Sequence, residues 1–192
     1  LINPDMASAH NNKGNALKEQ GRFDEAIKSY YKAISLKPDY VEAHNNLGIA
    51  FSDNNNFEEA INSYKKALSL NQNYADAHNN LGVALINLGK IEEAIEEYNR
   101  ALELKPNYAH AYNNLGTAMK KYGNLEASVQ AYKKALSLKP DYVEVYNNLG
   151  IALKDQGKPN EAISYYRKAL SLNPDYAQVY NNIGIILQES DN

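Results

Sequence analysis

Apolar residues recur at steps of three and four along most of the chain, which is the spacing of one face of an α-helix. Within residues 75–108, Leu81 and Leu85 share such a face in the first half, and a second apolar face follows around Tyr98. Gly89 separates the two halves. The pattern predicts two helices joined by a tight turn, and it predicts no strand.

This pattern returns with a period of 34 residues and without insertion, and an Asn-Asn pair marks each period. The pairs are residues 11–12, 45–46, 79–80, 113–114, 147–148 and 181–182. A fixed period means that every unit makes the same contacts with its neighbour, so we expect one array over residues 1–192. The predicted repeats are 7–40, 41–74, 75–108, 109–142 and 143–176, with 1–6 as the tail of a preceding repeat and 177–192 as the first helix of a further one.

Small and aromatic residues hold fixed places in each repeat. Gly48 and Ala60, like their equivalents, are expected where two helices cross closely, because a larger side chain would hold the backbones apart. Asn55 stands where other repeats have glycine, and a left-handed turn tolerates asparagine. One tyrosine in each second helix is expected to fill the space between hairpins. These tyrosines are Tyr30, Tyr64, Tyr98, Tyr132 and Tyr166.

The chain resembles the tetratricopeptide repeat family over nearly its whole length. The matching positions are the aromatic-type position (His44, Tyr112), Leu47-Gly48, Ala60, Tyr64, Ala67 and the proline near the end of most repeats. The resemblance implies an all-α fold, a right-handed superhelical solenoid of stacked helix-turn-helix hairpins. It also implies a concave groove lined by the first helix of each repeat, which binds an extended peptide or partner segment.

Helix geometry predicts which residues face this groove. Residues of each repeat are numbered here as positions 1–34, so that Asn46 is position 6 of repeat 41–74. An advance of about 100° per residue places positions 2, 5, 6, 9, 12 and 13 on the arc opposite the apolar residues. The predicted peptide-binding residues at positions 5, 6 and 9 are Asn12, Asn46, Asn80, Asn114, Asn148, Asn182, Asn45, Asn79, Asn113, Asn147, Ile49, Val83 and Ile151. Position 2 is mostly acidic, with Glu42, Asp76 and Glu144, but His110 in repeat 109–142.

The asparagine rows support two interpretations that are compatible with each other. Asparagine is a mediocre helix former, so helix propensity does not explain it, and its amide can both donate to and accept from a peptide backbone. Alternatively, position 6 joins neighbouring helices through hydrogen bonds between repeats. The rows are similar to the asparagine ladder of O-GlcNAc transferases. That resemblance implies an alternative function, the substrate-recruiting region of a larger glycosyltransferase.

Charge and composition narrow the class of partner. The formal net charge is -3 with both signs mixed along the chain, which does not favour nucleic acid, since phosphate binding needs clustered lysine and arginine. No apolar run is long enough to cross a bilayer. The expected partner is therefore a protein or peptide. End-to-end self-association is also expected if apolar residues of the last helix, such as Ile183, Ile186 and Leu187, are exposed.

The sequence holds no constellation typical of catalysis, and we expect a non-enzymatic chain without cofactor or metal. His10, His44 and His78 occupy the aromatic packing position of successive repeats, too far apart to share one small ion. Acidic pairs such as Glu58 and Glu59 fall in the first turn of a helix, where they complement the helix dipole. The absence of cysteine fits a reducing compartment, which favours a cytoplasmic or nuclear location. The chain opens at Leu1, which indicates a piece of a longer protein.

Overall fold

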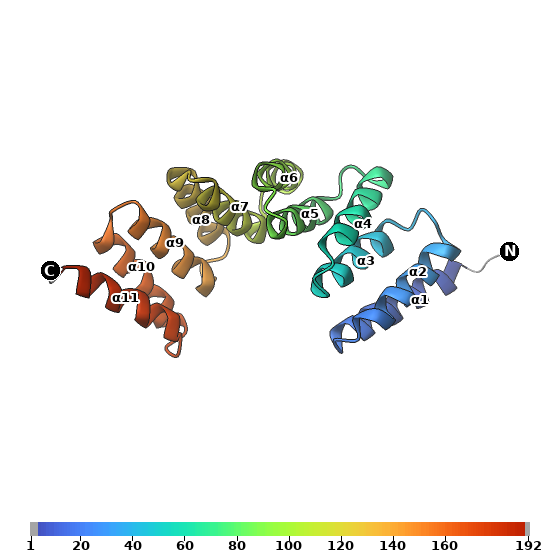
Figure 1. Cartoon of the computed structure of the whole chain (residues 1–192), viewed down its shortest axis with the longest axis horizontal. Helices are drawn as coiled ribbons and strands as arrows, with labels where there is room; N and C mark the ends of the chain where they lie inside the picture. Colours follow the sequence, from blue (N-terminus) through green and yellow to red (C-terminus); the bar gives the residue numbers. More distant parts are fainter. Residues whose placement is uncertain (1–3, 191–192) are drawn as a thin grey trace. The chain divides into compact units, whose positions relative to one another are not determined.

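The computed structural model describes residues 4–190, and within them it holds eleven α-helices and no strand (Figure 1). The all-α prediction is confirmed. The helices are α1 (Pro4–Glu19), α2 (Phe23–Leu36), α3 (Val41–Asp53), α4 (Phe57–Leu70), α5 (Ala75–Asn87), α6 (Ile91–Leu104), α7 (Ala109–Tyr122), α8 (Leu125–Leu138), α9 (Val143–Asp155), α10 (Pro159–Leu172) and α11 (Ala177–Ser190).

The chain divides into two compact units, residues 1–104 and 105–192. In the first unit α1 packs on α2, α3 on α4 and α5 on α6, and the second helix of each hairpin packs on the first helix of the next. The second unit repeats this arrangement with α7 to α11. Each unit is therefore a stack of helical hairpins, and the single array over residues 1–192 stays a prediction.

The two ends of the array differ in detail from the sequence-based prediction. Helix α1 begins at Pro4, three residues before the predicted repeat boundary at residue 7, and proline suits the start of a helix because its ring fixes φ there. The assignment of residues 1–6 to a preceding repeat stays a prediction. Helix α11 is the expected extra first helix. Ile186 is buried at 2 % exposure, which corrects its predicted exposure, whereas Leu187 is 53 % exposed. Residues 1–3 and 191–192 of the predicted end segments lie outside the described residues.

A left-handed residue makes the turn inside each of the described hairpins. Gly89 has φ of +74°, and Asn55 takes its place in the second hairpin with φ of +60°. In both turns the same two backbone hydrogen bonds close the first helix, for example from Lys90 N–H to Leu85 O at 3.0 Å. The prediction that asparagine serves in this turn is confirmed.

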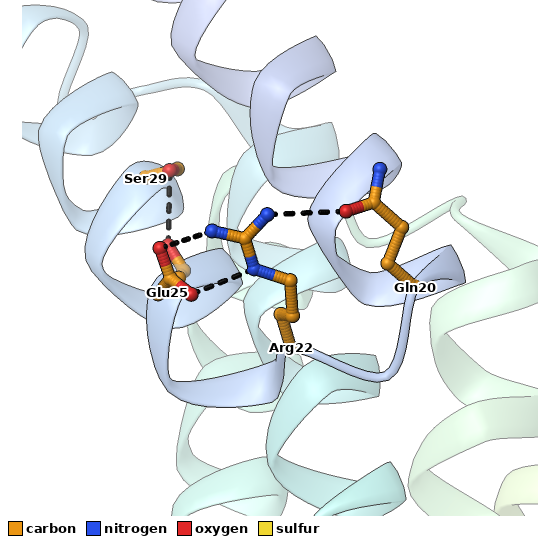
Figure 2. Close-up of polar contacts among 4 residues, drawn as sticks. All are labelled: Gln20, Arg22, Glu25 and Ser29. Atoms are coloured by element: carbon orange, nitrogen blue, oxygen red, sulfur yellow. Dashed lines mark hydrogen bonds and ion pairs between the residues drawn. The ribbon is translucent and has the colours of Figure 1, made fainter.

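The start of α2 is held by one arginine. Figure 2 shows the guanidinium of Arg22 donating two hydrogen bonds to the carboxylate of Glu25, both 2.7 Å long, and a third to Gln20 Oε1 at 3.2 Å. The side-chain oxygen of Ser29 donates to the Glu25 carbonyl at 3.0 Å. The hydrogen bond from Arg22 holds the pKa of Glu25 below its usual value. This fork takes the place of a side-chain cap, since Arg22 makes no cap bond to the helix backbone.

Each hairpin of residues 7–176 is centred on a contact between a glycine and a tyrosine ring. A Cβ atom on Gly48 would lie 2.5 Å from Cε1 of Tyr64, whose side chain is only 2 % exposed. The same pairs recur as Gly14–Tyr30, Gly48–Tyr64, Gly82–Tyr98, Gly116–Tyr132 and Gly150–Tyr166. The predicted close-packing role of these glycines is confirmed. The tyrosines are buried, but they pack against the first helix of their own hairpin, whereas the prediction placed them between hairpins.

Candidate functional site

Side-chain amides join successive first helices within each unit. In every case the amide nitrogen at position 6 of one repeat donates to the amide oxygen at position 5 of the repeat before it. The bonds run from Asn46 to Asn11 (3.0 Å), Asn80 to Asn45 (3.1 Å), Asn148 to Asn113 (3.1 Å) and Asn182 to Asn147 (2.9 Å). The interpretation that position 6 makes hydrogen bonds between repeats is therefore confirmed.

Position 5 is not on the free face, which corrects the prediction for these residues. The exposed fraction is 4 % for Asn45, 6 % for Asn79 and 2 % for Asn147, and Asn113 is half-buried. The helix-wheel prediction failed because it took into account a single neighbouring helix, the one that packs against the apolar face. Within each unit, a first helix also lies beside the first helix of the next repeat, whose position-6 asparagine bonds to position 5.

Positions 6 and 9 form the accessible part of the predicted site. Asn12 is exposed, and the other position-6 residues, Asn46, Asn80, Asn114, Asn148 and Asn182, are half-buried. At position 9, Ile49, Val83 and Ile151 are half-buried, and Ile185 is 45 % exposed. We call the residues at positions 2, 6 and 9 of the first helices the first-helix face. It exists separately in each unit.

A second row of contacts between repeats, which the sequence analysis missed, joins position 12 to position 13 of the next repeat. Lys18 Nζ lies 3.9 Å from Asp53 Oδ2, and Lys154 Nζ lies 3.1 Å from Glu189 Oε1. A third pair, Lys120–Asp155, has the same spacing along the chain. A search for opposite charges one residue beyond the repeat length would have found them. Such partly exposed pairs contribute about 0–1 kcal/mol each to the free energy of unfolding, so their effect on stability is small.

Two tyrosine hydroxyls explain why position 9 is not always aliphatic. Tyr30 OH donates to Asn15 Oδ1 at 2.7 Å, and Tyr132 OH lies 3.0 Å from Thr117 Oγ1. Burial, with a smaller effect of Asp53 and Glu19, raises the pKa of Tyr30 to about 12. A polar residue at position 9 therefore forms a hydrogen bond with the hydroxyl of the buried tyrosine beneath it. Asn15 and Thr117 have this structural role.

The histidines lie in structural contacts. His44 is buried, with Nε2 3.0 Å from the Pro38 carbonyl oxygen. His110 is exposed, and its Nδ1 lies 2.8 Å from Tyr142 OH. Among the described residues, no group of three histidine, cysteine, aspartate or glutamate side chains is arranged to hold a metal ion. None of the described helices has the length and apolar character of a membrane span.

Comparison with known proteins places the fold in a family. A TPR repeat model matches residues 14–55 and 118–157, and tetratricopeptide repeat models match residues 45–109, 97–130 and 143–176. A crystal structure of MamA is 33 % identical, covers 86 % of this chain and 96 % of its own, and has a TM-score of 0.76. The chain belongs to the tetratricopeptide repeat (TPR) family. TPR proteins are generally non-catalytic scaffolds for protein interactions, and this chain is accordingly a protein-interaction scaffold.

Two further solved structures are similar in fold to this TPR chain. The structure of Pseudomonas aeruginosa pilF is 21 % identical with a TM-score of 0.86, covering 97 % of this chain and 86 % of its own. That of YrrB is 22 % identical with a TM-score of 0.73, covering 90 % and 89 %. No curated relative matches the chain. At these identities the two structures establish the fold alone.

Proposed function

We propose that the first-helix face binds an extended segment of a protein partner. Position-6 asparagines would contact the backbone of that segment, and the aliphatic residues at position 9 would pack beside it. The proposal is supported by the similarity to YrrB, which is described as a TPR protein with an unusual peptide-binding site. The alternative, recruitment of substrate for a larger glycosyltransferase, rests on the resemblance of the asparagine rows alone.

The proposal depends on the direction of the hydrogen bonds from position 6 to position 5 of the preceding repeat, which we call the ladder bonds. Asn46 and Asn148 each use the side-chain amide nitrogen to reach the preceding repeat, and within residues 4–190 this is the single side-chain hydrogen bond of each. A primary amide has two N–H donors and an oxygen with two lone pairs. Each of these side chains therefore keeps an oxygen and a second N–H for a ligand, in an orientation that the ladder already fixes. Pre-oriented groups lose less entropy on binding than mobile ones.

The test compares two sets of asparagine substitutions in the same chain. The first replaces Asn46, Asn148 and Asn182 with alanine, and the matched control replaces the exposed second-helix residues Asn62, Asn99 and Asn160 with alanine. Peptides selected on the unsubstituted protein from a random peptide library serve as probes in fluorescence anisotropy. We expect the first set to weaken binding at least tenfold, because each lost hydrogen bond is worth about 1 kcal/mol, and the control set to leave it unchanged. Equal affinity of the two variants, corrected for folded fraction by circular dichroism, would reject the proposal.

A further inference from the structure

The tyrosine that closes a repeat commonly carries a lysine over its ring. The lysine comes from position 31 and the tyrosine is position 34, in the loop between hairpins. The ammonium lies 4.9 Å from the ring centroid for Lys37 over Tyr40, 4.2 Å for Lys105 over Tyr108 and 4.6 Å for Lys139 over Tyr142. At these distances the negative face of the ring attracts the cation. The ring at position 34 is thus a cation-binding surface in three repeats.

Repeat 41–74 lacks this lysine. Asn71 occupies position 31, and its side-chain oxygen accepts a hydrogen bond from Asn73 N–H at 3.0 Å, so the amide is used within the loop. Across residues 4–190, neither a lysine nor an arginine lies over the ring of Tyr74. The Tyr74 side chain is half-buried, so part of it reaches solvent. Tyr74 therefore has the ring of the other repeats without their cation.

Two acidic residues lie close enough to Tyr74 to influence its hydroxyl. Glu42 lies in the first turn of α3 and Asp76 in the first turn of α5, both at position 2 of the first-helix face. Burial first, then the charges of Asp76 and Glu42, raise the pKa of the Tyr74 hydroxyl. Tyr176 also lacks the lysine, since Asn173 stands at its position 31, but of the two neighbouring position-2 residues only Glu144 is acidic. Tyr74 thus has an uncovered aromatic ring near two acidic residues, of which Asp76 also has a contact within the protein.

We propose that Tyr74, Glu42 and Asp76 bind a lysine or arginine side chain of the partner segment. The inference rests on the proposed function, because Glu42 and Asp76 belong to the first-helix face on which that segment would lie. A cation from the partner would take the place that Lys37, Lys105 and Lys139 hold in the other repeats. The Glu42 carboxylate would pair with it, the charge of nearby Asp76 would favour it, and the cation would lie over the face of the Tyr74 ring. The partner is therefore a protein segment with at least one basic side chain.

The test supplies the missing cation from the chain itself. The double variant N71K/Q72P gives residues 70–74 the same sequence as residues 104–108, where Lys105 covers Tyr108. The single variant Q72P is the matched control, because it changes the loop without adding a cation. A random peptide library is selected on the unsubstituted protein, and the affinity of the retained peptides is measured for all three proteins.

We expect the retained peptides to be enriched in lysine and arginine. Their affinity should fall about fivefold in N71K/Q72P and stay unchanged in Q72P, the size of a lost contact between a cation and an aromatic ring. Peptides that bind without basic enrichment, or equally well to the double variant, would overturn the inference and leave the proposed function standing. A protein that retains no peptide at all would overturn both.

Discussion

Replacing Gly48 with alanine tests the contact at the centre of the second hairpin. The added Cβ would lie 2.5 Å from Cε1, 2.7 Å from Cδ1 and 2.9 Å from Cζ of Tyr64. Optimal carbon–carbon contacts are about 3.5–4.0 Å, so the overlap is about 1 Å on three ring atoms. Tyr64 is 2 % exposed and cannot swing into solvent. The ring or the helix must therefore move.

Two opposing effects set the magnitude. Alanine is about 1 kcal/mol more favourable than glycine in a helix interior. Overpacking a core costs about 1–3 kcal/mol, and an overlap with three atoms of a confined ring lies at or beyond the upper end. We expect a net loss of about 2 kcal/mol in the free energy of unfolding. For a chain of this size that loss corresponds to a decrease of about 4–8 °C in Tm.

Gly184 provides the matched control. It occupies the same position in α11, and among the described residues nothing lies within 4 Å of the Cβ that alanine would add. Gly184→Ala should therefore leave Tm unchanged or raise it slightly. Both variants are measured by thermal denaturation with circular dichroism. Hydrogen exchange of α3 and α4 is measured as well, because hairpins of a repeat array can open separately. If Gly48→Ala raises Tm as much as Gly184→Ala, the steric argument is refuted.

Two further substitutions test the polar contacts. Asn45→Ala removes the acceptor of the Asn80 amide and should lower the free energy of unfolding, measured by urea denaturation, by about 1–3 kcal/mol. The control Asn62→Ala changes an exposed residue and should cost less than about 0.5 kcal/mol. Equal values would contradict a structural role for the asparagine bonds between repeats. The second concerns His78, whose Nδ1 lies 2.6 Å from Glu97 Oε2 and whose Nε2 lies 3.0 Å from the Gln72 carbonyl. Burial lowers its pKa, but these two contacts outweigh burial and the charge of Arg100, and the net pKa is raised above 6.5. The stabilisation by protonated His78 is therefore fully present below about pH 6.5 and is lost as pH rises through the folded-state pKa of His78. Glu97→Gln should reduce this pH dependence. The measurement is the free energy of unfolding between about pH 5 and 8.

The fold could be predicted because its determinants repeat within the sequence. The contact between Gly48 and Tyr64 recurs in five repeats, so the same packing argument applies to each of them. The turn at Asn55 was predictable for the same reason, since its equivalents are glycines with positive φ. What a helix wheel lacks is the neighbour from the next repeat. Asn45 is buried beside Asn80 of the next repeat, whose amide nitrogen donates to Asn45 Oδ1, and no pattern within one helix contains that information.

Under the proposed function, different accessible residues would contribute to the affinity for a partner and to the choice between partners. Position 6 is asparagine in every repeat, so its contacts with a backbone would be the same along a bound segment and would read none of its side chains. Discrimination between partners has to come from places where the repeats differ. Position 2 changes from Glu42 and Asp76 to His110, and position 31 changes from lysine to Asn71. No lysine lies over Tyr74 among residues 4–190, and Glu42 and Asp76 lie near it. At the equivalent Tyr142, His110 contacts the hydroxyl and Lys139 covers the ring, so the two rings offer a cation different surroundings. Under the proposed function, a segment with one basic residue would bind in the register that brings this residue to Tyr74, and the position-6 asparagines would contact the backbone on either side.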